Sequence, residues 1–232
     1  MKIKKRKILV FAAHPDDEVL GCGGSVAKWA IQGHDVHFTI MSEGVTGRDI
    51  KRNRNKRYDK ISKLQMAARK SAKILGVKSI KLFDFPDNRM DSVDLIDIIK
   101  KIEKQIRILK PDTVVTHHHG DLNVDHKIVH EAVLTSCRPQ KNNTVKRILS
   151  FEVPSSTEWT SPNKKTTFTP NHFEDISRTL KLKLRALKEY KMEMRLWPHP
   201  RSFKGVKHLA NWRGSTIGCD SAEAFMLVRN IE

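Results

Sequence analysis

Short apolar runs alternate with segments of helical periodicity along the first two thirds of the chain. Residues 7–13, KILVFAA, are almost entirely apolar, which is typical of a strand buried on both faces of a parallel sheet. Similar runs predict further strands at residues 35–41, 79–83, 113–116 and 146–153. Between them, the apolar positions predict helices over residues 25–32, 61–75, 93–110 and 128–137. This alternation predicts an α/β fold with an open, mainly parallel sheet, right-handed crossovers and helices on both faces.

The pattern changes after residue 153. Residues 155–170 are rich in Ser, Thr, Pro and Asn and predict a loop, as does the polar and densely basic segment 42–58. The next apolar positions predict one long amphipathic helix: Phe173, Ile176, Leu180, Leu184 and Leu187. A helix at 206–212 and a strand at 224–228 complete the chain. We therefore expect a core over 1–153 and a C-terminal helical and loop elaboration over 154–232, packed on it in one structural domain.

Length and composition agree with a single folded domain. The chain has 232 residues, of which 38% are hydrophobic and 30% charged, values that do not favour disorder or a fibrous repeat. Its apolar runs are too short for a membrane span or a secretory signal. The three cysteines are far apart and form no C-x-x-C pair, so we expect no disulfide framework, no cysteine zinc site and a reducing, cytoplasmic compartment.

The charge of the chain is strongly positive. It has 44 basic and 26 acidic residues, a net charge of +18. Such a field attracts nucleic acid, an anionic membrane surface or a phosphorylated small molecule, and charge alone does not choose among them.

Two clusters of ionisable residues follow predicted strands. The first is Ala13-His14-Pro15-Asp16-Asp17-Glu18, directly after the first strand, where open α/β sheets bind ligands. On a helical turn His14 and Asp17 share one side and Asp16 leaves in another direction. This spacing lets an imidazole and a carboxylate share a metal and leaves a second carboxylate beside it. The simpler alternative is a helix start, with Pro15 at its first position and acids near the positive end of the dipole.

The second cluster covers residues 117–126, HHHGDLNVDH, after the fourth predicted strand. A catalytic zinc site takes three protein ligands and keeps one position open, a scheme that His14, Asp17 and one histidine of this loop would fill. Each of His117, His118 and His119 is more typical of a hydrogen-bonded structural histidine than of a ligand.

These two motifs, A-H-P-D-D-E and the later D-x-N-x-D-H, resemble those of the PIG-L or LmbE-like family of zinc-dependent N-deacetylases. The resemblance covers residues 7–153, and WPHPRS with Arg213-Gly214-Ser215 is similar to one branch of the family. It implies a Rossmann-like fold, a divalent metal that is usually zinc, with Fe²⁺ or Co²⁺ as alternatives, and removal of an acetyl group from an amino sugar. A homo-oligomer is compatible with it, although the chain itself carries no signal for one.

Site roles follow from the same resemblance. It implies that His14, Asp17 and His126 are the metal ligands and that Asp16 is the general base. Asp125 matches a carboxylate next to the third ligand and is expected to orient a metal ligand from behind. Asn123 stands at a catalytic position where other members often carry a histidine that polarises the scissile carbonyl.

Substrate recognition is expected in loops at the carboxyl ends of the strands. Trp159 is a candidate to stack on a sugar, and Arg201 or Arg213 to hold a phosphate or carboxylate, with His199 in the same region. Many members have an arginine and a glutamate on the helix where this chain has Leu64 and Ala67, and Arg48, Arg54 or Arg57 are candidate substitutes.

The sequence thus predicts a deacetylase of an N-acetylated sugar carried on an anionic, nucleotide- or phosphate-linked acceptor. One alternative is a hydrolase of a non-sugar amide, and another is a non-catalytic family member. A basic nucleic-acid-binding protein, suggested by the runs at 2–7 and 52–57, is disfavoured because aromatics are only 6% and no nucleic-acid motif is present.

Overall fold

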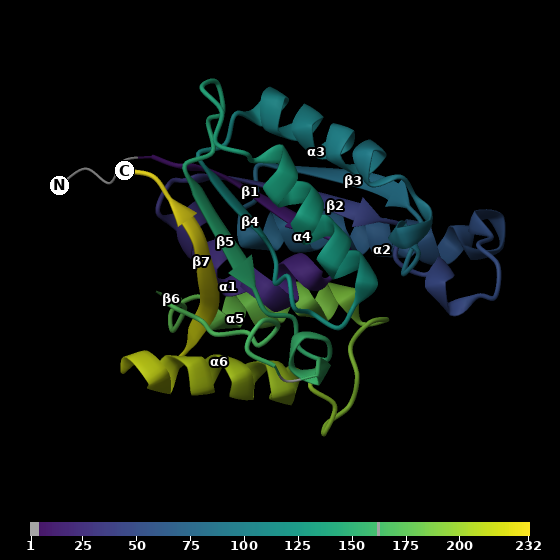
Figure 1. Cartoon of the computed structure of the whole chain (residues 1–232). Helices are drawn as coiled ribbons and strands as arrows, with labels where there is room; N and C mark the ends of the chain where they lie inside the picture. The colour runs from purple at the N-terminus through teal and green to yellow at the C-terminus, as the bar shows by residue number, and fades with distance from the viewer. Residues whose placement is uncertain (1–4, 162) are drawn as a thin grey trace.

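One seven-stranded sheet forms the centre of the protein (Figure 1). The computed structural model describes residues 5–161 and 163–232, and within them the strand order is β3-β2-β1-β4-β5-β7-β6. The strands are β1 (Lys7–Ala12), β2 (Asp35–Ser42), β3 (Ser79–Phe85), β4 (Thr113–His117), β5 (Arg147–Phe151), β6 (His172–Asp175) and β7 (Ala222–Asn230). The pairs from β3 to β5 are parallel, whereas β7 runs antiparallel to both β5 and β6. The predicted open, mainly parallel α/β sheet is confirmed.

Helices cover both faces of this sheet. They are α1 (Asp17–Ile31), α2 (Arg54–Leu75), α3 (Leu95–Leu109), α4 (Val124–Ser136), α5 (Leu180–Leu187) and α6 (Phe203–Ile217). One face carries α1, α2 and α5, the other α3 and α4, and α6 packs against β7 (Figure 1). Along β1, Ile8 and Val10 pack with the first group, and Leu9 and Phe11 with the second. Both sides of the strand are therefore buried, which explains its unbroken apolar sequence.

The long helix predicted from Phe173 to Leu187 is wrong in its first half. Residues His172–Asp175 form β6, in which Phe173 pairs with Ala224 of β7, and the helix begins only at Leu180. The antiparallel edge of β7 gives this segment backbone partners that the apolar spacing does not reveal. Because β6 and β7 extend the same sheet and α5 packs on α1 and α2, residues 154–232 share their contacts with the first part of the chain.

Four helices, α1, α2, α4 and α6, begin earlier than their apolar spacing predicts. Helix α1 starts at Asp17 and includes Gly23 and Gly24 beyond a kink at Cys22. A Cβ on Gly24 would lie 2.7 Å from Ile176 Cδ1. Close packing against Ile176, rather than a helix boundary, therefore explains why this position is a glycine. Helices α2 and α4 start directly after Asn53 and Asn123, whose side chains accept backbone N–H groups of the first turn. The predicted loop 42–58 is correspondingly shorter.

Among the described residues, no helix is long and apolar enough to cross a membrane. The basic run at 2–7 lies partly outside those residues.

Candidate metal and substrate site

The site lies where β1 and β4 end side by side. Strand β1 sits between β2 and β4, so the connections leave it towards opposite sides of the sheet, the place at which such sheets bind ligands. The backbone N–H of Ala13 donates to Nε2 of His117 over 2.8 Å, which fixes the two strand ends together. The turn after β1 therefore faces the first turn of α4, which carries His126.

Three side chains meet there in an arrangement that suits a metal. His14 Nδ1, Asp17 Oδ2 and His126 Nε2 are separated by 3.1 Å, 3.1 Å and 3.2 Å. Ligand bonds of about 2.0–2.1 Å at tetrahedral angles place ligand atoms about 3.3 Å apart, so the three atoms fit one face of a tetrahedral centre. Asp17 and His126 are buried, and His14 is nearly so. Nitrogen and carboxylate ligands of this kind suit zinc and also other divalent transition metals.

Carboxylates also orient both histidines from behind. Nε2 of His14 lies 3.0 Å from Asp125 Oδ2, and Asp125 accepts the backbone N–H groups of Asn88 and Met90. Nδ1 of His126 lies 3.1 Å from Asp121 Oδ1, and Asp121 accepts hydrogen bonds from two hydroxyl groups of the segment after β5. Such contacts fix the ring orientation and make the metal-facing nitrogen more basic. Asp125 thus contacts His14, rather than the adjacent His126.

Asp16 occupies a strained and buried position beside the three ligand atoms. Its φ is 117°, a left-handed conformation that is costly for a residue other than glycine and is found mostly at functional sites. Its carboxylate lies 3.3 Å from Nη1 of Arg201. Burial raises the pKa of Asp16 to about 7, although Arg201 opposes the rise. A carboxyl group with this pKa can both take up and return a proton near neutral pH.

Glu18 holds the backbone of Asp16. Its carboxyl accepts the N–H of Asp16 over 3.1 Å and the hydroxyl of Tyr190 over 2.5 Å. Burial raises the pKa of Glu18 to about 8, with Tyr190 acting in the opposite direction. The contact explains how the turn keeps its strained geometry.

A pocket of about 110 Å³ opens above the ligand atoms. Besides the AHPDD turn and His126, its lining includes Gly44, Arg48, Asp87, Asn88, Asn123, Glu193 and Arg201. Arg48 and Arg201, both expected from the sequence, therefore border the site. Arg213, in contrast, lies outside this lining and makes a two-pronged ion pair with Glu152. Trp159 and His199 also lie outside it, in an edge-to-face pair with ring centres 5.6 Å apart.

Asn123 has a double role at the pocket edge. Its Oδ1 accepts the N–H of Asp125 over 2.9 Å and caps α4, while its Nδ2 donates to Asn88 over 2.7 Å. The neighbouring histidines make structural contacts. His117 accepts the backbone bond described above, and His118 and His119 contact the carbonyl oxygens of Thr166 and Lys165.

Sequence reasoning missed several groups of the site. The sequence points to the strand-end loops that hold Asp121, Asp87 and Asn88, since ligands collect there, but it does not single out these side chains. Glu193 carried no such signal, because it follows α5 and reaches the site only through tertiary folding.

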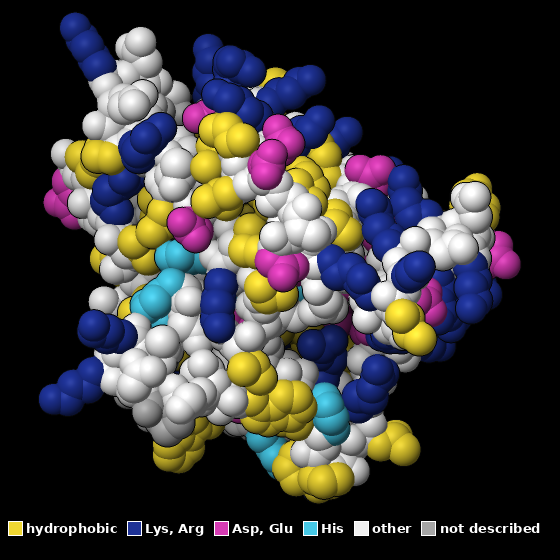
Figure 2. All heavy atoms as spheres, turned by 45° about the vertical axis from the view of Figure 1, so that its right-hand side comes forward, with side chains coloured by type: hydrophobic (Ala, Val, Ile, Leu, Met, Phe, Trp, Pro, Cys, Tyr) yellow, Lys and Arg dark blue, Asp and Glu magenta, His cyan; other side chains and the backbone are white. Residues whose placement is uncertain are grey.

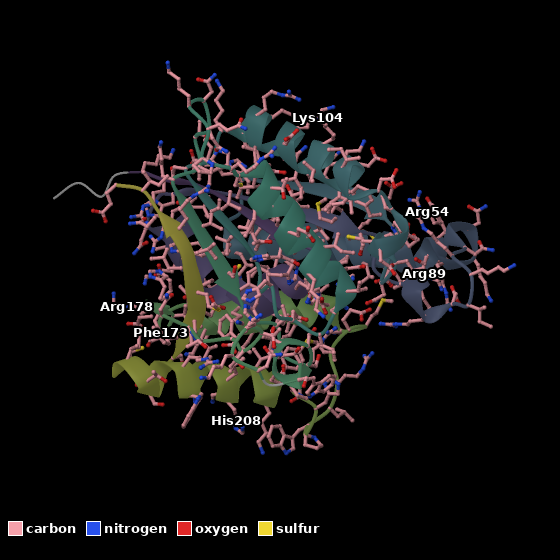
Figure 3. The ribbon with its side chains drawn as sticks, viewed as in Figure 1. Arg54, Arg89, Lys104, Phe173, Arg178 and His208 are labelled. Atoms are coloured by element: carbon pink, nitrogen blue, oxygen red, sulfur yellow. The ribbon has the colours of Figure 1, made fainter. Side chains whose placement is uncertain are left out.

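The basic run 52–57 is largely neutralised by neighbouring acids. Arg52 and Arg54 both contact Glu43, and Arg57 pairs with Asp49. Arg89, after β3, donates to the carbonyl oxygens of Asp49 and Ile50, so it ties the same loop to the neighbouring strand end (Figure 3). These arginines stabilise the loop beside the site, which limits their availability to a nucleic acid.

Comparison with known proteins shows the family of the chain. The family model described as PIG-L, GlcNAc-PI de-N-acetylase, matches residues 9–137, more than half of the chain. The chain belongs to the PIG-L family. An uncharacterized deacetylase of Escherichia coli, YaiS, is 32% identical over 194 residues, which cover 81% of this chain and 92% of that protein. The diacetylchitobiose deacetylase of Thermococcus kodakarensis is 27% identical over 250 residues, 97% of this chain and 84% of the relative.

The fold itself is shared with proteins of another activity. The solved structure of GalB, a 4-carboxy-2-hydroxymuconate hydratase of Pseudomonas putida, matches with a TM-score of 0.76 at 22% identity and covers 98% of each chain. The fold therefore does not select a reaction, and a function has to be argued from the residues of the site.

Proposed function

We propose that this protein is a metal-dependent hydrolase that removes the acetyl group from an N-acetylated amino sugar. The observation that carries the proposal is the group of three ligand atoms 3.1–3.2 Å apart with the Asp16 carboxyl in the same pocket. The names of the relatives, deacetylases in Escherichia coli and Thermococcus kodakarensis, support acetyl removal and an amino-sugar substrate.

His14, Asp17 and His126 would hold the metal. When bound, a divalent cation polarises an amide carbonyl and lowers the pKa of water towards 7. Asp16 takes a proton from the water molecule as its oxygen attacks the acetamido carbon. The carbon–nitrogen bond then breaks, the proton passes from Asp16 to the leaving amine, and acetate is released. A pKa of about 7 suits both directions of this transfer.

Zinc is the metal that we propose, with Fe²⁺ or Co²⁺ as alternatives that the same nitrogen and oxygen ligands accept. The substrate sugar is proposed to be attached to an anionic carrier, because the net charge of +18 attracts such a molecule. Figure 2 supports this view, since Lys and Arg side chains are spread widely over the face it displays, with fewer acidic groups between them.

An Asp16→Asn variant tests the proposal. Acetate release from N-acetylglucosamine and N,N'-diacetylchitobiose should fall about 10²- to 10⁴-fold, while metal content, measured on the same sample by atomic absorption, should stay at the wild-type level. Near-normal turnover by the variant would contradict the role of Asp16. Hydrolysis by the wild type of acyl amides without a sugar, at the expense of both sugars, would favour the non-sugar alternative.

A further inference from the structure

The pocket is not basic, although the protein as a whole is. Four carboxyl groups line it, those of Asp16, Asp17, Asp87 and Glu193, against two guanidinium groups. A bound divalent cation brings this balance only to neutrality. Both arginines are already paired, Arg201 with Asp16 and Arg48 with Glu193. A phosphate inside this pocket would find no excess positive charge to balance its own, which disfavours it. The anionic carrier group proposed above therefore belongs outside the pocket.

Arg48 is the more exposed of the two arginines that line the pocket, and it has donors to spare. Its Nη2 donates to Oε2 of Glu193 over 2.6 Å, and this is its one hydrogen bond within residues 5–161 and 163–232. A guanidinium carries five N–H donors, and the Arg48 side chain is 49% exposed. Its partner Glu193 is buried, with 7% exposure, and therefore holds the guanidinium in place. The pair joins the turn after β2 to the segment after α5 across the pocket.

The wall of the pocket at Gly44 is backed by apolar side chains. Leu64 and Ala67 of α2 stand where the family resemblance predicts an arginine and a glutamate, and both are buried in the hydrophobic core. Leu64 Cδ1 lies 3.2 Å from where a Cβ on the pocket residue Gly44 would sit. Helix α2 thus presents an apolar side chain behind this wall, and polar recognition must come from elsewhere.

We propose that Arg48, positioned by Glu193, donates hydrogen bonds to a ring hydroxyl of an uncharged sugar residue in the pocket. This assignment rests on the proposed function and specifies its substrate: the residue that loses its acetyl group is a neutral sugar. Arg48 is the contacting residue, and Glu193 acts through it.

Arg48→Met and Glu193→Gln test the proposal, with Lys28→Met as the matched control. Lys28 makes an ion pair of the same 2.6 Å length with Glu174, and neither residue lines the pocket. The substrates are N-acetylglucosamine and its 3-, 4- and 6-deoxy analogues. Arg48→Met should lower kcat/KM for N-acetylglucosamine about 10- to 100-fold, mainly through KM, because a charged donor to a hydroxyl is lost. Glu193→Gln should have a smaller effect in the same direction, and Lys28→Met none.

The deoxy analogues separate contact from general damage. In the wild type, one deoxy analogue should have a higher KM than N-acetylglucosamine. In Arg48→Met, removal of the same hydroxyl should not raise KM further. Additive losses for every analogue would overturn the assignment. Calorimetric titration of N-acetylglucosamine into the metal-free protein gives a second readout, and weaker binding by Arg48→Met is expected there too. Wild-type protein that binds the sugar but releases no acetate refutes the proposed function alone. If the wild-type protein does not bind the sugar, or if Arg48→Met binds it equally well, the proposed contact between Arg48 and the sugar is refuted.

Discussion

The apparent affinity of the site for a divalent metal should rise steeply with pH, because the metal must displace protons from its ligands. Burial favours neutral histidines, but Asp17 and Asp121 outweigh it and raise the pKa of His126 to about 9. For His14 burial is likewise outweighed, by Asp125 and Asp17, and its pKa is well above the usual value. Burial acts to raise the pKa of Asp17, but His126 and His14 hold it well below its usual range. At neutral pH the metal-free site therefore holds protons on both imidazoles.

The size of the effect follows from these protons. Releasing one proton makes the apparent dissociation constant fall about tenfold per pH unit below the pKa of the group. For His126 alone, the interval from pH 7 to a pKa of about 9 corresponds to about 100-fold, or about 3 kcal/mol. Release of a second proton from His14 makes the slope steeper, up to about 100-fold per pH unit where both rings are protonated.

Competition of the purified protein with a chelator of known affinity, at pH 6.0 to 8.5 and constant ionic strength, measures this slope. A His119→Gln variant changes a histidine that is not one of the three proposed metal ligands, and it should show the same slope. The same protons stabilise the metal-free fold: since the pKa of folded His126 is raised, its contribution is complete below about pH 6.5 and is lost as the pH rises through about 9. An affinity that does not change between pH 6.0 and 8.5 would refute the ligand assignment.

Two further changes test buried carboxylates, one behind a proposed metal ligand and one in an ion pair away from the pocket. Asp121→Asn removes the carboxylate behind His126 and should weaken metal binding about 10- to 100-fold in the same titration, with an unchanged circular dichroism spectrum; equal affinity would show that Asp121 does not orient the ligand. Glu223→Gln leaves the buried ammonium of Lys183 without its 2.6 Å partner and should cost about 3–5 kcal/mol in urea unfolding. Glu103→Gln, at an exposed pair with Lys100, should change it by under about 1 kcal/mol, and equal losses in both variants would contradict this reasoning.

The sequence predicts the centre of the sheet well because β1, β2, β4 and β5 are buried on two faces and therefore have largely apolar sequences. The same reasoning fails for Phe173, whose strand lies at the sheet edge and depends on backbone pairing with β7, about fifty residues later. Helix starts are also displaced, because α1 begins with the acidic motif and α2 with a basic segment, and neither shows apolar spacing.

For the site, the sequence indicates the residues that follow neighbouring strands, and the structure brings His14, Asp17 and His126 together as expected from the two motifs. Glu193 could not be predicted. It is separated from Arg48 by 145 positions, and the carboxylate enters the pocket only because α5 packs against α1 and α2. The charge of the pocket could not be predicted either, because the net charge of the chain does not show where buried acidic side chains come together in the fold.

Asp16 and Asp17 are adjacent carboxyl groups whose pKa values are driven in opposite directions, which assigns them different tasks. Burial raises the pKa of both carboxyl groups. His126 and His14 reverse this for Asp17, whereas for Asp16 the opposing charges, Arg201 first and then His14, do not outweigh it. An ionised Asp17 suits a metal ligand, and a carboxyl that titrates near neutrality suits proton transfer. Arg201→Met removes the opposing charge, so the acidic limb of the pH profile of kcat/KM should move to higher pH. A bound cation lowers the pKa of Asp16 in both proteins and leaves the direction of this difference unchanged. A limb at the same pH in both would show that another group takes the proton.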